Sequence, residues 1–196
     1  MVSSNRLAIS SPAKGLLVYQ TNGQTGFYYY NGLEWDTLDG HSTVNSITEL
    51  NNSSIAVVRD IKAASTDGGD FNPGSWETRD LNDLQGDSSF ITIDGVSSFS
   101  LDSGIYEVSI IAPGRSVGVH QIRLYNVDSS SVVAIGTAAN TATASTNSEI
   151  YSVFTINVTT KFEVHHQCSS IQISDGKGSA IGWGENVYTQ VRIQKY

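Results

Sequence analysis

Two adjacent histidines and the single cysteine form the segment that most resembles a metal-binding motif. His165, His166 and Cys168 lie close together at the end of a run of alternating polar and apolar residues. Neighbouring side chains of a β-strand point to opposite faces, so His165 and His166 cannot bind one ion together. His166 and Cys168 share a face, but two protein ligands are fewer than a zinc site needs. We therefore predict no metal site and a buried His166, with a site built from three copies of His166 on a threefold axis as the alternative.

Aspartates gather at residues 67–70 and 80–87, where their carboxylates have the chemistry of calcium ligands. The calcium-loop pattern that ends in a glutamate at the twelfth position is absent from the sequence. Asp-Gly pairs are also ordinary turn sequences. We interpret both segments as turns and predict that the protein needs no cofactor.

Nucleophilic and phosphate-binding motifs are not complete anywhere in the sequence. There is no G-x-S-x-G nucleophile elbow. Gly176-Lys177-Gly178-Ser179 resembles the end of a phosphate-binding loop, but Ile171 stands where that motif requires its first glycine. Carboxylate pairs for glycoside hydrolysis come together only in the fold, and nothing in the sequence marks one. We predict a protein that is not an enzyme.

Aromatic side chains are then the remaining candidates for a binding function. Trp183 lies between two glycines in the segment 181–186, where a large ring can be presented to a ligand. We predict that Trp183, Asn186 and Asp175 contact a ligand, and that Trp76 packs within the fold. The loops expected to carry binding groups are residues 66–89, 113–118, 137–148 and 174–186.

The elements that must position these residues are short β-strands separated by turn sequences. Alternation is clearest where Phe162, Val164, His166 and Cys168 share one face of a strand. Strands are expected at residues 55–61, 90–93, 96–101, 105–111, 117–127, 132–137, 149–158, 161–168 and 187–193. This spacing predicts an all-β fold, a jelly-roll β-sandwich, over residues 55–196.

The first 50 residues are expected to form a separate small unit. After an irregular leader over residues 1–13, three strands are predicted at residues 15–20, 27–30 and 33–38, with Asn-Gly pairs at the turns. A meander of this size is too small to be stable alone and must pack on something. Residues 39–54 form a polar connector, in which residues 44–50 have the spacing of a short helix. We interpret residues 1–50 as an attachment or adaptor unit.

Composition and charge exclude several classes of partner. The net charge is −8 and only 15% of residues are charged, so no basic stripe exists for nucleic acid or for an anionic membrane. No apolar run is long enough for a membrane span or a signal peptide. We therefore expect no nucleic acid partner, no membrane insertion, synthesis in a cytoplasm, and exposure to the outside through assembly into a particle.

Two sets of residues resemble virion proteins. Residues 15–19, 26–32 and Trp35 resemble a short β-module of phage fibre and surface proteins. The second set is similar to the C-terminal domains of phage tail fibres, which resemble the complement-type and tumour-necrosis-factor-like trimeric jelly rolls; it comprises residues 68–71, 74–82, 104–106, 112–113, 120–127, 162–168 and 187–188.

The resemblance implies a homotrimer at the tip of a fibre or spike that binds host surface glycans, with no catalytic residues. His120, Arg123, His166 and Cys168 match the motif, and the resemblance implies that they lie in the core or on the trimer axis. We expect residues 1–50 to bind other virion proteins. The alternatives are a structural capsid or tail decoration protein without a ligand and a glycan-cleaving enzyme of the tailspike type.

Overall fold

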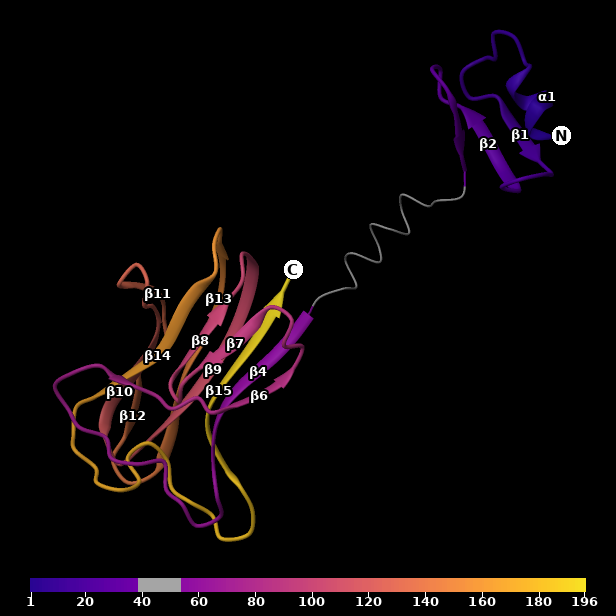
Figure 1. Cartoon of the computed structure of the whole chain (residues 1–196). Helices are drawn as coiled ribbons and strands as arrows, with labels where there is room; N and C mark the ends of the chain where they lie inside the picture. The colour runs from indigo at the N-terminus through magenta and orange to yellow at the C-terminus, as the bar shows by residue number, and fades with distance from the viewer. Residues whose placement is uncertain (39–53) are drawn as a thin grey trace. The chain divides into compact units, whose positions relative to one another are not determined.

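The computed structural model describes residues 1–38 and 54–196, and the chain divides into two compact units, Met1–Asn52 and Ser53–Tyr196 (Figure 1). Each unit is described by itself. The segment 44–50, for which a short helix is considered above, lies outside the described residues. No helix among the described residues is long and apolar enough to cross a membrane.

The N-terminal unit is a small antiparallel sheet preceded by one short helix. Strands β1 (Leu17–Gln20), β2 (Gly26–Tyr30) and β3 (Trp35–Thr37) follow one another in the sheet, which confirms the predicted meander. The leader is not irregular throughout, because Ser3–Leu7 form helix α1. A helix of five residues is too short to produce a hydrophobic period in the sequence. It is held instead by Arg6, whose Nε donates a 2.9 Å hydrogen bond to Oε1 of Gln20.

The second unit consists of two antiparallel sheets packed face to face, which confirms the predicted all-β sandwich (Figure 1). The first sheet has the order β13-β9-β15-β4-β6. These strands are β13 (Ser145–Ile156), β9 (Gly104–Arg115), β15 (Asn186–Lys195), β4 (Ser54–Lys62) and β6 (Asp83–Gly86).

The second sheet has the order β11-β10-β14-β8-β7, with β12 paired to β10 and β5 paired to β14. Its main strands are β11 (Ser131–Ile135), β10 (Gly118–Asn126), β14 (Thr160–Cys168), β8 (Ser98–Leu101) and β7 (Ile91–Asp94). The short strands are β5 (Glu77–Thr78) and β12 (Ala139–Thr141). Apart from the consecutive pairs β7-β8 and β10-β11, neighbouring strands in both sheets are not consecutive in the chain, as in a jelly roll.

The core lies between the sheets and follows the period of two that strands impose. Along β9, buried and half-buried residues alternate from Tyr106 to Gly114. On β14, Phe162, Val164, His166 and Cys168 are all buried, as the alternation predicts. The ring of Phe162 packs against Phe99 and Phe154, with centroids 5.8 and 5.5 Å apart.

Three differences from the predicted strands have local causes. The segments 66–89 and 137–148 are expected to be loops, but β5 and β6 lie in the first segment and β12 lies in the second. These strands pair at edges and are too short for an alternating pattern to be recognised in the sequence. Strand β9 continues through Pro113 instead of ending before it. Pro113 pairs with Asn147 on β13, whereas the pairing of β9 with β15 stops at Ile111. No hydrogen bond to β15 therefore needs the N–H that Pro113 lacks.

Candidate functional site

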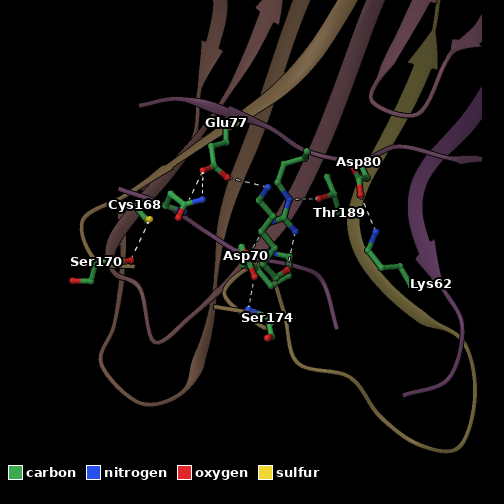
Figure 2. Close-up of polar contacts among 12 residues, drawn as sticks. Lys62, Asp70, Glu77, Asp80, Cys168, Ser170, Ser174 and Thr189 are labelled. Atoms are coloured by element: carbon green, nitrogen blue, oxygen red, sulfur yellow. Dashed lines mark hydrogen bonds and ion pairs between the residues drawn. The ribbon is translucent and has the colours of Figure 1, made fainter. Parts of the chain in front are cut away.

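The aspartates of the segment 67–70 bind backbone of the opposing loop. Asp67 accepts a 2.8 Å hydrogen bond from the amide of Ala180, and Asp70 accepts one of 2.6 Å from the amide of Ser174 (Figure 2). A Cβ on Gly68 would lie 2.7 Å from the carbonyl of Lys177, so only glycine permits this approach of the two loops. The segment 67–70 is therefore part of a loop whose carboxylates tie two loops together. The turn interpretation of the segment 80–87 is wrong, because this segment contains strand β6. Among the described residues, no group of three or more His, Cys, Asp or Glu side chains could hold a metal ion.

A fully buried arginine anchors these loops to the sandwich. Arg79 donates to the hydroxyl of Thr189 at 2.8 Å and to the carbonyl of Lys177 at 2.9 Å. Burial lowers the pKa of Arg79 to about 10, partly offset by the negative charges of Asp60 and Asp80. Burial also raises the pKa of Asp60, and Lys62, 3.3 Å from it and 2.8 Å from Asp80, opposes that shift (Figure 2). The cluster stabilises the end of the sandwich, and only the charges of its residues could have indicated it from the sequence.

Two buried histidines meet between β10 and β14. Nδ1 of His120 lies 2.9 Å from Nε2 of His166, and Nε2 of His120 lies 2.8 Å from the hydroxyl of Thr146. Nδ1 of His166 is buried without a partner among the described residues. The hydrogen-bond network therefore assigns a proton to Nε2 of each ring, which leaves no buried N–H unpaired. Burial lowers the pKa of both histidines.

The outer face of the β10-β14 sheet carries a stacked cluster of aromatic and cationic side chains. The guanidinium carbon of Arg123 lies 4.3 Å from the centre of the Trp76 ring and 5.0 Å from that of Tyr125. Tyr125 in turn stacks on His165 with centroids 4.5 Å apart. Nε of Arg123 donates to Nδ1 of His165 at 3.2 Å, so Nε2 of His165 carries the proton that it donates to Glu163 at 2.8 Å.

The predicted ligand-contact residues differ in exposure and in their partners. Trp183 is 85% exposed, as expected for a presented ring. Asn186 is buried, and its side chain closes the 181–186 loop by accepting from the amide of Ile181 and donating to the carbonyl of Ala63. Asp175 forms an ion pair with Arg115. In the single chain, Trp183 is therefore the one of the three whose side chain is fully presented.

Of the four residues assigned to the core or trimer axis, three are buried and one is not in the core. His120, His166 and Cys168 are buried. Arg123 instead lies on the outer face, because it is on the same side of β10 as Gln121 and Tyr125. Trp76, predicted to pack, does pack on Arg123, but it remains partly exposed and belongs to the outer-face cluster. Strand β5 is too short for its alternation to indicate this placement from sequence.

Two further surfaces are rich in exposed apolar side chains. On the N-terminal sheet, Arg6 covers one face, 4.0 Å from the centre of Tyr28. The opposite face exposes Leu17, Tyr19 and Phe27, with Tyr19 and Phe27 in edge-to-face contact at 4.9 Å. We call it the apolar face of the N-terminal sheet.

On the sandwich, the outer face of the β13-β9 pair exposes Tyr151, Val153 and Ile105, which we call the β13-β9 face. Apolar patches of this kind on a soluble unit mark surfaces that another molecule covers.

Residues 1–55 match a protein-family model described as a phage tail like trimerisation region. The N-terminal part of the chain is therefore similar to a phage tail-like trimerisation region. A search of the curated proteins finds no match to the chain.

Two solved structures illustrate the similarity of the second unit to known folds. Murine APRIL is 10% identical with a TM-score of 0.49, over 74% of this chain and 100% of APRIL. The globular domain of zebrafish complement 1qA protein is 14% identical with a TM-score of 0.46, over 72% of this chain and 95% of that domain. The order of the strands in its two sheets makes the second unit a jelly roll.

Proposed function

We propose that this protein is a homotrimeric, phage tail fibre-like virion protein, not an enzyme, that attaches the particle to the host surface through its jelly roll. The match of residues 1–55 to a phage tail-like trimerisation region carries the proposal. In it, the N-terminal unit joins three chains and binds other virion proteins, and the jelly roll is exposed on the particle. The expected ligand is a glycan of the host surface.

The apolar face of the N-terminal sheet supports the trimer. Three strands and a five-residue helix give a core that is too small for this unit to be stable alone. Phe27, Tyr19 and Leu17 are about half exposed in a single chain. Packing three such faces together would remove these side chains from water, at roughly 25 cal/mol for each Å² of apolar surface buried.

The composition of the jelly-roll surface supports attachment to an uncharged ligand. With a net charge of −8, the chain repels nucleic acid and anionic lipid alike. The loops are held by hydrogen bonds such as those of Asp67 and Asp70, so side chains at their ends are presented on a rigid scaffold. Three copies on one particle multiply a weak affinity for each site into firm adhesion.

Two measurements test the proposal: the native mass of the protein in solution and the adhesion of the protein to bacterial cells. Light scattering on the full chain at micromolar concentration is expected to give a mass three times the 21.0 kDa of one chain. The fluorescently labelled protein is then applied to a panel of bacterial strains, and saturable binding to at least one strain is expected. A monomer overturns the trimer. A trimer that binds no strain, although the corresponding particle infects one of them, overturns attachment and leaves a structural decoration role.

A further inference from the structure

A small cavity opens on the outer face of the sandwich beside Trp76. It has a volume of about 260 Å³ and lies where β10 and β14 run side by side. Trp76 forms one wall, and the outward side chains of Gln121 and Gln167, which are register partners, lie next to it. Val119 and Ser169 close the end of the cavity, and His120 and Cys168 complete its lining.

The lining combines a flat aromatic ring with uncharged hydrogen-bonding groups. Trp76 and Val119 offer apolar surface, while two amide side chains and one hydroxyl offer donors and acceptors. His120 and Cys168 are neutral near pH 7, because burial lowers the pKa of His120 to about 4 and raises that of Cys168. An uncharged ligand with apolar C–H faces and several hydroxyl groups complements this lining, and a sugar ring has that chemistry.

The walls of the cavity are held in place by contacts behind them. Arg123 stacks on Trp76 at 4.3 Å and is itself fixed by its hydrogen bond to His165. Nε2 of Gln121 donates to the carbonyl of Gly136 at 2.8 Å. Such preorganisation reduces the entropy that a ligand must overcome on binding.

The amide of Gln167 makes no hydrogen bond with any residue in the described part of the chain, whereas the hydroxyl of Ser169 accepts from the amide of Val119 at 2.9 Å. Gln167 therefore combines a fixed strand position with a free amide. A ligand in the cavity would meet its donor and acceptor without displacing a protein contact.

Size and charge define the class of ligand further. Cavities that hold drug-sized ligands have roughly 300–1,000 Å³, so this smaller one suits a single sugar ring. The cation beside it, Arg123, is already engaged with Trp76 and His165, and the whole chain is acidic. An acidic sugar would therefore be repelled rather than selected.

We propose that the cavity bounded by Trp76, Gln121 and Gln167 is a binding subsite for one uncharged sugar unit of a host surface polysaccharide. The inference rests on the proposed attachment function and names the site and the class of ligand. The sugar ring stacks on Trp76, and its hydroxyl groups bond to the two amides. The subsite is repeated in each chain of the trimer, so a weak single affinity is sufficient.

The test uses the full chain and four defined probes. Methyl α-glucoside, methyl β-galactoside, N-acetylglucosamine and N-acetylneuraminic acid are titrated by saturation-transfer NMR. We expect at least one of the three uncharged sugars to bind, and we expect Gln167→Ala and Trp76→Ala to weaken that binding about tenfold or more. Gln85→Ala is the matched control, since it removes an exposed amide from β6 of the other sheet, and it is expected to leave sugar binding unchanged. Trp183→Ala tests the exposed ring of the 181–186 loop as the rival binding site.

Gln167→Ala keeps the test decisive if Trp76→Ala fails to fold, because the Gln167 amide supports no contact among the described residues. Sugar binding that survives Gln167→Ala and is lost in Trp183→Ala overturns the subsite and leaves the attachment function intact. Binding of N-acetylneuraminic acid alone, or of none of the probes by a protein that adheres to cells, overturns the uncharged-sugar assignment. A protein that neither binds the probes nor adheres to any infected strain overturns the attachment function as well.

Discussion

Nδ1 of His120 lies 2.9 Å from Nε2 of His166, and both rings are buried. The two nitrogens share one proton, so the pair is stable only while both imidazoles are neutral. Arg79 and Lys177 add positive charge near His166, which further opposes its protonation. Protonation of either ring would break this arrangement, so the stability of the jelly roll is expected to depend on pH.

Stability is expected to fall as the pH drops from about 6.5 towards 4. In the unfolded chain both histidines take up a proton near pH 6.5, whereas in the folded chain burial lowers the pKa of His120 to about 4 and that of His166 well below 6.5. The unfolded state therefore binds more protons across this window, and the free energy of unfolding decreases with falling pH. We expect a loss of about 2 kcal/mol from His120 by pH 4.5, and a further loss from His166.

Urea unfolding at pH 7.0 and pH 4.5 measures this loss. His166→Gln replaces one imidazole with a group that does not titrate, so the difference in unfolding free energy between the two pH values is expected to shrink. Burial of Asp60 acts in the opposite direction near pH 4, since its raised pKa favours protonation of the folded state, and it affects both proteins equally. Equal pH dependence in the two proteins would show that the histidines do not carry it.

Removing the buried cation is expected to destabilise the sandwich strongly. Arg79→Met deletes hydrogen bonds to Thr189 and to the carbonyl of Lys177, and it leaves the buried Asp60 with Lys62 as its neighbouring cation. Breaking such a buried arrangement costs about 3–5 kcal/mol. Adding Asp60→Asn to Arg79→Met is expected to recover part of the loss, because it removes a buried carboxylate that has lost one of its two cations.

Arg59→Met is the matched control for this experiment. Arg59 pairs with Asp83 at 2.7 Å but remains partly exposed, and such pairs contribute roughly 0–1 kcal/mol. Urea unfolding of the four proteins gives the comparison. A loss in Arg79→Met no larger than that in Arg59→Met would contradict the anchoring role of Arg79.

The fold follows from the sequence where strands are long and buried on one side. The alternation over residues 105–111 and 161–168 predicts both the strands and the faces that enter the core, because these segments are long enough for a period of two to be recognised. Strands β5, β6 and β12 have two to four residues and pair at edges. Tertiary pairing alone defines them, so the sequence carries no period that could reveal them.

The candidate site was less predictable because it depends on register between distant strands. Trp76 and Gln167 lie 91 positions apart in the sequence, and the pairing of β5 with β14, through Thr78–His165 and Glu77–His166, brings their segments together. Trp183 was predictable as an exposed ring because glycines flank it. The side-chain amide of Asn186 has the donors and acceptor to bind a ligand, but its hydrogen bonds are used to close its own loop.

Disrupting the apolar face of the N-terminal sheet is expected to dissociate the trimer. Phe27→Asp places a charge where a half-exposed aromatic ring would be covered by another chain. Burial of a phenylalanine side chain is worth about 1.5–3 kcal/mol, and three copies are lost at once. Light scattering on the full chain should show the mass fall towards 21.0 kDa. Leu33→Asp is the control at an apolar side chain that is 91% exposed in a turn, and a loss of mass in both variants would place the interface elsewhere.

The jelly rolls are also expected to contact one another through the β13-β9 face. Tyr151 is 72% exposed and its neighbours Val153 and Ile105 extend the apolar surface across two strands, so covering them would add to the stability of the trimer. Tyr151→Glu is expected to shift dissociation of the full-length trimer to higher protein concentration, by about tenfold or more. Ile135→Glu is the matched control, because Ile135 is 66% exposed on β11 of the opposite sheet. Light scattering over a dilution series compares the two; an equal shift in both variants would mean that added charge, and not this face, governs assembly.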